Sequence, residues 1–275
     1  MRVLLDNSIL TTENIILLKK SKLLDLSKKH SIKIYGNPIL LDEIYNLWSL
    51  GRKTEMKKYL EYILEISNER WFRDTEGMLR LELENKNLTN KYFFYNNSEK
   101  MRIENQIKYL LISEQLTKED EQEIKRIKDE IELRKSNFNG CCSLLRNQKK
   151  VNLKQLNFND FYSQYSDYCG EELLSRQLNI SKENSIINNW KKNKNNFPYS
   201  DLWVKGIMYI IFYAYVECNK MLDKNANFDI NQLIFLKDLD VVVSEEQRFL
   251  KSACNALYGN TKRYFSVEDL LFSLN

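Results

Sequence analysis

The fold is decided by a short stretch at the start of the chain, Arg2-Val3-Leu4-Leu5-Asp6, in which an apolar run ends on an acid. Such a run, followed by helical spacing of Leu and Ile over 11–29, predicts a strand and then a helix. Residues 31–35 alternate polar and apolar side chains, and Gly36-Asn37-Pro38 predicts a turn, an N-cap and a first-turn proline before a helix over 39–50. The opening therefore predicts the order strand, helix, strand, helix.

The end of the chain returns to the same pattern. A β-branched run, Asp240-Val241-Val242-Val243-Ser244, predicts a strand that stops at Glu245-Glu246. Around it we expect a helix over 201–222 capped by Ser200, helices over 230–236 and 247–257, a strand near 263–265, and a last helix capped by Ser266. Because strands that alternate with helices form parallel sheets through right-handed crossovers, both ends of the chain predict one α/β sheet covered on both faces.

The middle of the chain predicts helices and no strand. Apolar residues recur every three or four positions over 55–67, 75–84, 98–116 and 118–135, with shorter helical pieces near 153–166, 171–177 and 182–192. We therefore expect a discontinuous α/β core, 1–50 and 200–275, with a large all-helical insertion at 51–199.

Composition excludes several kinds of site. The chain has 275 residues and a formal net charge of +4, so bulk charge does not identify a nucleic-acid binder. The seven glycines never fall within five residues of one another, which excludes a P-loop and a dinucleotide fingerprint. One histidine and five cysteines without a C-x-x-C pair provide no framework for a closed zinc site.

Two further patterns bear on location. The odd, scattered cysteines and an acid at position 6, where a signal peptide would need an apolar core, predict a cytoplasmic protein. The densest apolar stretch, 202–216, is interrupted by Lys205 and closed by Glu217, so it is too short to span a membrane. We expect a buried central helix there and no membrane partner.

Acids lie near the ends of the predicted strands, where open parallel sheets bind their ligands. The positions concerned are Asp6, Glu43, Asp229, Glu245 and Glu246. Each acid alone has a simpler explanation as a helix cap or a partner of the helix dipole. Together, carboxylates without histidine or cysteine would select Mg²⁺ or Mn²⁺ and activate a water to attack a phosphodiester.

The same residues carry a family resemblance. Leu4-Leu5-Asp6-Asn7-Ser8-Ile9-Leu10 resembles the opening motif of PIN-domain nucleases, and Ile39-Leu40-Leu41-Asp42-Glu43-Ile44 resembles their second motif. Segments 227–233 and 239–249 are similar to their third, and 264–271 resembles their last strand and helix. The resemblance covers about 1–50 and 200–275 and implies a PIN-like three-layer α/β/α fold around a central parallel sheet.

The resemblance also implies functional residues. The acids that would bind Mg²⁺ or Mn²⁺ and carry catalysis are Asp6, Glu43, Asp229 and Glu246, the last standing where the family usually has Asp. Supporting roles fall to Asn7, Ser8 and Ser244, and Glu245, Asp201 and Asp240 are held in reserve.

Basic residues beside an aromatic side chain predict where a nucleic acid is held. The candidates are Trp190, Lys191, Lys192, Lys194, Arg146, Lys149 and Lys150. The alternative explanation is a solvated surface.

The leading hypothesis is a cytoplasmic, metal-dependent endonuclease that acts on RNA rather than DNA, in a toxin, RNA-processing or anti-phage setting. The insertion would then choose the substrate or bind a protein partner or inhibitor, and a homodimer is left open. The alternative is a binding module on the same fold, with weakened acids, whose insertion docks a protein or nucleic acid. A third hypothesis, a small-molecule phosphohydrolase, ranks last because no Asp-x-Asp start is present.

Overall fold

The structure, a computed structural model, describes residues 1–29, 31–67, 69–84, 93–122, 124–126, 129, 157–214 and 226–274. The strands are β1 (Arg2–Leu5), β2 (Lys33–Ile34), β3 (Val241–Val243) and β4 (Arg263–Phe265). The α-helices in the first part of the chain are α1 (Thr12–Lys20), α2 (Leu23–Lys28), α3 (Pro38–Ser49), α4 (Lys53–Ile66), α5 (Thr75–Glu84) and α6 (Asn97–Ile112). Those in the second part are α8 (Phe158–Leu178), α9 (Ser185–Lys192), α10 (Pro198–Phe212), α11 (Ala226–Phe235), α12 (Phe249–Tyr258) and α13 (Val267–Ser273). Short 3-10 helices are η1 (Asn7–Ile9), η4 (Lys194–Asn196) and η6 (Leu236–Asp238).

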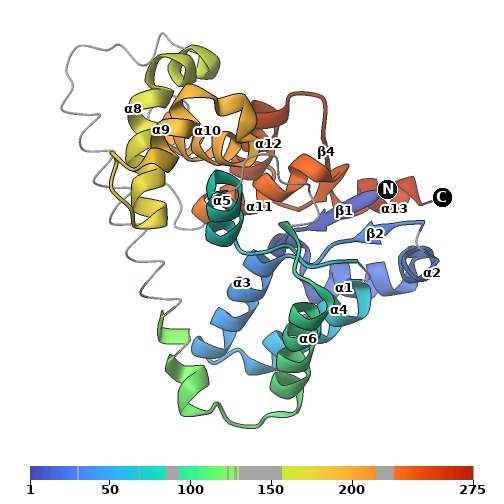
Figure 1. The fold of residues 1–275 in the computed structure, drawn as a ribbon. Helices are drawn as coiled ribbons and strands as arrows, with labels where there is room; N and C mark the ends of the chain where they lie inside the picture. Colours follow the sequence, from blue (N-terminus) through green and yellow to red (C-terminus); the bar gives the residue numbers. More distant parts are fainter. Residues whose placement is uncertain are drawn as a thin grey trace.

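The four strands form one parallel sheet in the order β2-β1-β3-β4 (Figure 1). At the centre of the sheet, Val3 of β1 is in register with Ile34 on one side and with Val241 on the other. The two ends of the chain therefore meet in the sheet. This confirms the expectation of a mixed α/β fold whose all-parallel sheet draws on both ends of the chain.

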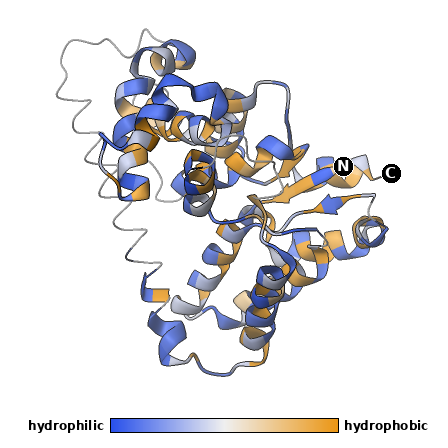
Figure 2. Ribbon diagram, in the orientation of Figure 1, coloured by the Kyte–Doolittle hydropathy of each residue, from blue (hydrophilic) through white to orange (hydrophobic). Residues whose placement is uncertain are grey.

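Helices cover both faces of this sheet (Figure 1). Because successive side chains of a strand point to opposite faces, Leu4 and Val242 pack into one buried hydrophobic cluster with residues of α10, α11 and α12. Val3, Val241 and Val243 pack into a second cluster with residues of α1, α3, α4 and α13. Figure 2 shows hydrophobic residues along β1 and interspersed on the surrounding helices, as this two-sided burial requires.

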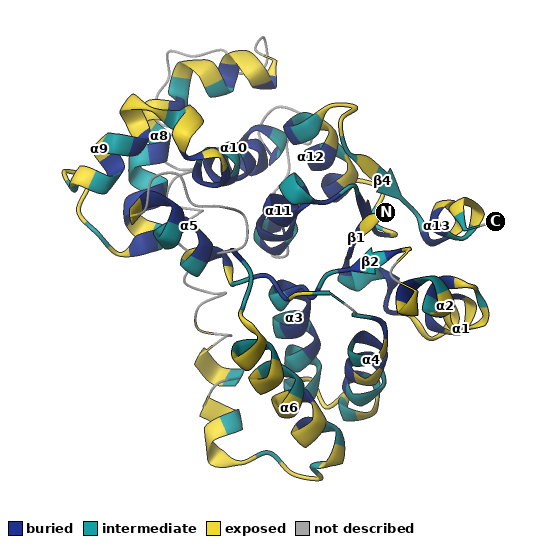
Figure 3. Ribbon diagram, turned by 45° about the vertical axis from the view of Figure 1, so that its right-hand side comes forward, coloured by how far each residue is buried: buried dark blue, intermediate teal, exposed yellow. Residues whose placement is uncertain are grey.

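Helix α10 is the buried central helix that the apolar stretch predicts, and Figure 3 shows α10 and α11 as largely buried. No helix in the described ranges has the length and apolar character needed to cross a membrane. The helix starts at Pro198, and Ser200 lies within its first turn, so the expectation that Ser200 caps it is wrong. The cap comes instead from Glu82 of α5, whose carboxylate accepts the backbone N–H groups of Tyr199 at 2.9 Å and Ser200 at 2.7 Å.

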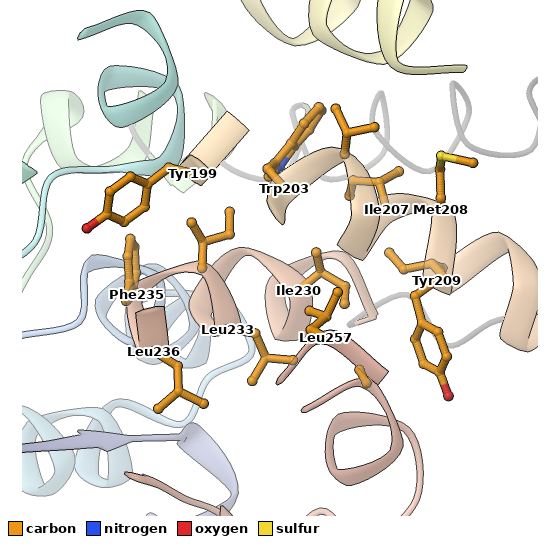
Figure 4. Close-up of a cluster of buried hydrophobic side chains, with 14 of the residues drawn as sticks. Tyr199, Trp203, Ile207, Met208, Tyr209, Ile230, Leu233, Phe235, Leu236 and Leu257 are labelled. Atoms are coloured by element: carbon orange, nitrogen blue, oxygen red, sulfur yellow. The ribbon is translucent and has the colours of Figure 1, made fainter. Parts of the chain in front are cut away.

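A glycine lets α10 and α11 approach closely. A Cβ atom at Gly206 would lie only 2.5 Å from Cγ2 of Ile230 on α11. Figure 4 shows Ile230 and Leu233 of α11 beside the apolar side chains of α10, among them Ile207. Gly206 therefore sets the distance between the buried helix α10 and the helix that carries Asp229.

Within the described part of 51–199, the regular elements are helices and no strand is found, as expected, but two isolated bridges occur there. After α4, Trp71 forms an isolated parallel bridge with Gly36, and Phe72 forms an antiparallel bridge with Phe94. Residues from this part also enter both hydrophobic clusters, because α4 packs on α3 while α5 and α8 pack on α10. The division into a core and an insertion at 51–199 stays a prediction.

The helix predicted over 11–29 is in fact two helices. Ser21 separates α1 from α2, because its hydroxyl donates to Leu18 O at 2.6 Å and accepts the backbone N–H of Leu23 at 3.1 Å. A serine side chain that bonds to nearby backbone groups competes with the helical ladder. Apolar periodicity continues through this break and does not reveal it.

Candidate functional site

Asp6 is the first residue after β1, and its side chain is only 4% exposed. Its backbone N–H donates to Val243 O at 3.0 Å, which aligns the ends of β1 and β3. Its carboxylate caps η1: Oδ2 accepts the backbone N–H of Ser8 at 3.2 Å and the Ser8 hydroxyl at 2.5 Å. Asn7, the other predicted supporting residue in this turn, is half-buried beside it.

Ser244 joins Asp6 from the end of β3. Its fully buried hydroxyl donates to Asp6 Oδ2 at 2.7 Å and lies 2.9 Å from the Ser8 hydroxyl. The two hydroxyls also accept the backbone N–H groups of Glu245 and Glu246, at 2.8 Å and 3.0 Å. The structure thus brings the predicted supporting residues Ser8 and Ser244 directly onto Asp6.

Two buried amide side chains complete the surroundings of Asp6. Gln232 of α11 donates from Nε2 to Asp6 Oδ1 at 2.6 Å, and its Oε1 accepts from Asn37 Nδ2 at 3.2 Å. Sequence reasoning identified Asn37 only as a helix cap and missed Gln232. A polar residue one helical turn after Asp229, within the apolar run of α11, is the signal that could have found it.

Glu43 lies on α3 with a partly buried side chain. Burial, and then the charges of Asp6 and Asp42, raise its pKa from 4.5 to about 8. The charge of Asp6 contributes to this shift because a nearby carboxylate disfavours the charged form of its neighbour. Within the described part of the chain, no hydrogen bond to the Glu43 carboxylate is found.

Tyr264 of β4 is affected by the charges of three predicted acids, among them Asp229 and Glu246. Burial raises its pKa above its ordinary value, and the charges of Asp6, Glu246 and Asp229 act in the same direction. Its hydroxyl donates to the backbone carbonyl of Glu246. Tyr264 is therefore a site residue that the search for acids missed, because a tyrosine inside a short strand carries no sequence signal of its own.

Glu246 and Glu245 both act as caps. The Glu246 carboxylate accepts backbone N–H groups at the start of α12, from Arg248 at 2.8 Å and Phe249 at 3.1 Å. Glu245 Oε1 accepts the N–H of Val267, the first residue of α13, at 2.8 Å. The simpler explanation from the sequence, that acids after strands cap helices, applies to both of them.

The reserve acids lie elsewhere. Asp201 accepts a hydrogen bond from the Tyr162 hydroxyl of α8. Asp240 precedes β3, at the opposite end of the strand from Ser244, and forms an ion pair with Arg2 at 2.7 Å. Neither acid belongs with Asp6.

The oxygen donors fit a hard cation only in part. Asp6 and Glu43 bring two carboxylates together, and the unbonded Glu43 carboxylate is the group that a divalent cation would satisfy. Across the described ranges, however, no set of three or more His, Cys, Asp or Glu side chains is arranged to hold a metal ion. The site therefore offers two protein carboxylates, and a cation there would complete its coordination with other oxygens, such as those of water or a phosphate.

The predicted nucleic-acid contacts have mixed outcomes. Trp190 lies on α9 and is fully buried with Gly170 against its ring, so it is not available to stack on a base. Lys194 is held by Asp167 at 2.6 Å, and Lys191 by Glu171. The remaining candidate among the described residues is Lys192, which is exposed. Arg146, Lys149 and Lys150 lie outside the described residues.

Comparison with known proteins identifies no relative: no protein-family model, no curated protein and no solved structure matches the chain.

Proposed function

We propose that this chain is a metal-dependent nuclease with a PIN-like core that hydrolyses phosphodiester bonds, with RNA as its preferred substrate. One observation carries the proposal: the Glu43 carboxylate is partly buried beside Asp6 and has no hydrogen bond in the described part of the chain. Two carboxylates in a shared, desolvated environment repel each other, and a divalent cation between them removes that cost. Asp6 also directly follows a parallel strand, and the ends of such strands are where these sheets bind ligands.

Each residue of the site has a role in this proposal. Asp6 and Glu43 hold Mg²⁺ or Mn²⁺, and the hydroxyls of Ser8 and Ser244 fix the orientation of Asp6. Asp229 provides further negative charge, which acts on Tyr264 of β4 as the charge of Asp6 does. When bound, the cation supplies positive charge that activates water and neutralises the charge developing on the phosphate.

A second candidate function is a binding module on the same fold. The observation that favours it is the Glu246 carboxylate, which is occupied by backbone N–H groups of α12. In this case the acids stabilise helix ends, and Mn²⁺ has no specific site.

The experiment uses the purified full chain with labelled single-stranded RNA and DNA, in Mn²⁺ or in EDTA. We expect RNA cleavage that needs Mn²⁺ and is lost in Asp6→Asn. Asp240→Asn is the matched control, because it neutralises an acid at the other end of the sheet and should leave cleavage unchanged. Cleavage that survives Asp6→Asn would contradict the nuclease. Tight RNA binding without cleavage and without Mn²⁺ binding would favour the binding module.

A further inference from the structure

The amide side chains next to Asp6 each have a single consistent orientation. The backbone N–H of Ile39 donates to Asn37 Oδ1 at 3.1 Å, which caps α3 and commits the oxygen end of that amide. The nitrogen end of Asn37 must then face Leu5 O and Gln232 Oε1, to which it donates at 3.2 Å in each case. Asn37 is 1% exposed and Gln232 is 2% exposed, so water cannot substitute for these hydrogen-bond partners.

The same logic fixes Gln232. Because its Oε1 is committed to Asn37, its Nε2 faces Asp6 Oδ1, where it donates at 2.6 Å. Turning either amide by 180° would set a donor against a donor, or an acceptor against the Asp6 carboxylate. The hydrogen bonds therefore run in one direction, from the start of α3 through Asn37 and Gln232 to Asp6.

We propose that Gln232 is a positioning residue for the metal site, and that it orients the Asp6 carboxylate relative to Glu43 and Asp229. This inference rests on the proposed nuclease function. Asp6 Oδ2 already accepts three hydrogen bonds, so Oδ1, the oxygen bound by Gln232, is the one with acceptor capacity left. This series of hydrogen bonds, called the relay below, also connects β1, α3 and α11. Asn37 caps α3, the helix that carries Glu43, and Gln232 lies one turn after Asp229 on α11.

The test measures Mn²⁺ binding by isothermal titration calorimetry in the full chain. Gln232→Met keeps the length of the side chain and removes the donor to Asp6. We expect it to weaken Mn²⁺ binding about 10- to 100-fold, the loss usual when the partner of a metal ligand is removed. The matched control is Asn231→Leu, which removes a buried hydrogen bond of the adjacent residue on α11, from Trp203 Nε1 at 3.0 Å. The control should change the Mn²⁺ affinity less than twofold.

A second variant acts one step earlier in the relay. Asn37→Ser retains a side chain able to cap α3 but removes the donor to Gln232 Oε1, so it should weaken Mn²⁺ binding severalfold with the fold intact. It decides the matter if Gln232→Met does not fold.

The outcomes separate the two proposals. Suppose that the wild type binds Mn²⁺ and cleaves RNA. If Gln232→Met and Asn37→Ser then bind Mn²⁺ as tightly as wild type, or no more weakly than Asn231→Leu, the positioning role is overturned and the nuclease stands. If the wild type neither binds Mn²⁺ nor cleaves, the nuclease is overturned and this inference with it.

Discussion

Gly206→Ala is a sharp test of how α10 and α11 pack. In an exposed helix, replacing Gly by Ala stabilises a protein by up to about 1 kcal/mol, because Ala has the higher helix propensity. At Gly206 the added methyl group would lie 2.5 Å from Cγ2 and 3.5 Å from Cδ1 of Ile230. Carbon atoms pack comfortably at about 3.5–4.0 Å, so one helix must move by about 1 Å.

The magnitude follows from the surroundings. Gly206 and Ile230 are both buried, on helices α10 and α11 whose residues are mostly buried. Overpacking a dense core costs about 1–3 kcal/mol, and a contact this short belongs at the upper end of that range. After subtraction of the helix-propensity gain, we expect the free energy of unfolding to fall by about 1–2 kcal/mol.

Urea unfolding followed by tryptophan fluorescence measures this change. Gly77→Ala in α5 is the control, because its new methyl would meet the exposed side chain of Asp74, which can move aside. The control should keep or slightly gain stability. In a double-mutant cycle with Ile230→Ala, the double mutant should lose less stability than the sum of the two single-mutant losses, by at least about 1 kcal/mol. A Gly206→Ala variant as stable as wild type, or strictly additive losses, would refute the close contact.

Burial raises the pKa of Glu82 from 4.5 to about 7. As pH rises, Glu82 loses its proton in the unfolded chain before it does so in the folded one, so the free energy of unfolding should fall between about pH 5 and about pH 7. Urea titrations at pH 5 and pH 8 should show that Glu82→Gln removes a part of this fall worth up to about 3 kcal/mol; an unchanged pH dependence would contradict the assignment. Gly170→Ala should lower the unfolding free energy by about 1–3 kcal/mol, since its Cβ would lie 2.1 Å from Cη2 of Trp190, and a thermal melt equal to wild type would disprove that packing. Asp240→Asn should cost less than about 1 kcal/mol, because both members of its ion pair with Arg2 are more than 40% exposed; a larger loss in urea would mean that this pair is coupled to the sheet.

The strands and most helices could be predicted because burial imposes a period on the sequence. Val241, Val242 and Val243 show this most directly, since a β-branched run buried on both faces is typical of a parallel strand. The break at Ser21 and the caps supplied from distant residues could not be predicted. They depend on single hydrogen bonds, such as those from Tyr199 and Ser200 to Glu82, that leave no periodic pattern.

The candidate site was predictable to the extent that topology determines it. Residues that follow parallel strands must meet at one end of the sheet, which is why Asp6, Ser8 and Ser244 could be placed together. The role of Glu246 depends on a side-chain rotation, and a carboxylate after a strand can turn towards a helix start as readily as towards a ligand. Gln232 was missed for a related reason, since its function depends on which end of its amide faces Asp6.

The central position of β1 has a consequence for how the protein is made. Ser244, which holds Asp6, follows it by 238 residues. During synthesis β1 leaves the ribosome long before β3 and β4 exist, so one edge of it stays unpaired while most of the chain is translated. The bonds of Asp6 to Gln232 and Ser244 can form only when the last few dozen residues emerge. A nascent chain that ends before Gln232 and Ser244 therefore lacks the hydrogen bonds that hold the Asp6 carboxylate from α11 and β3.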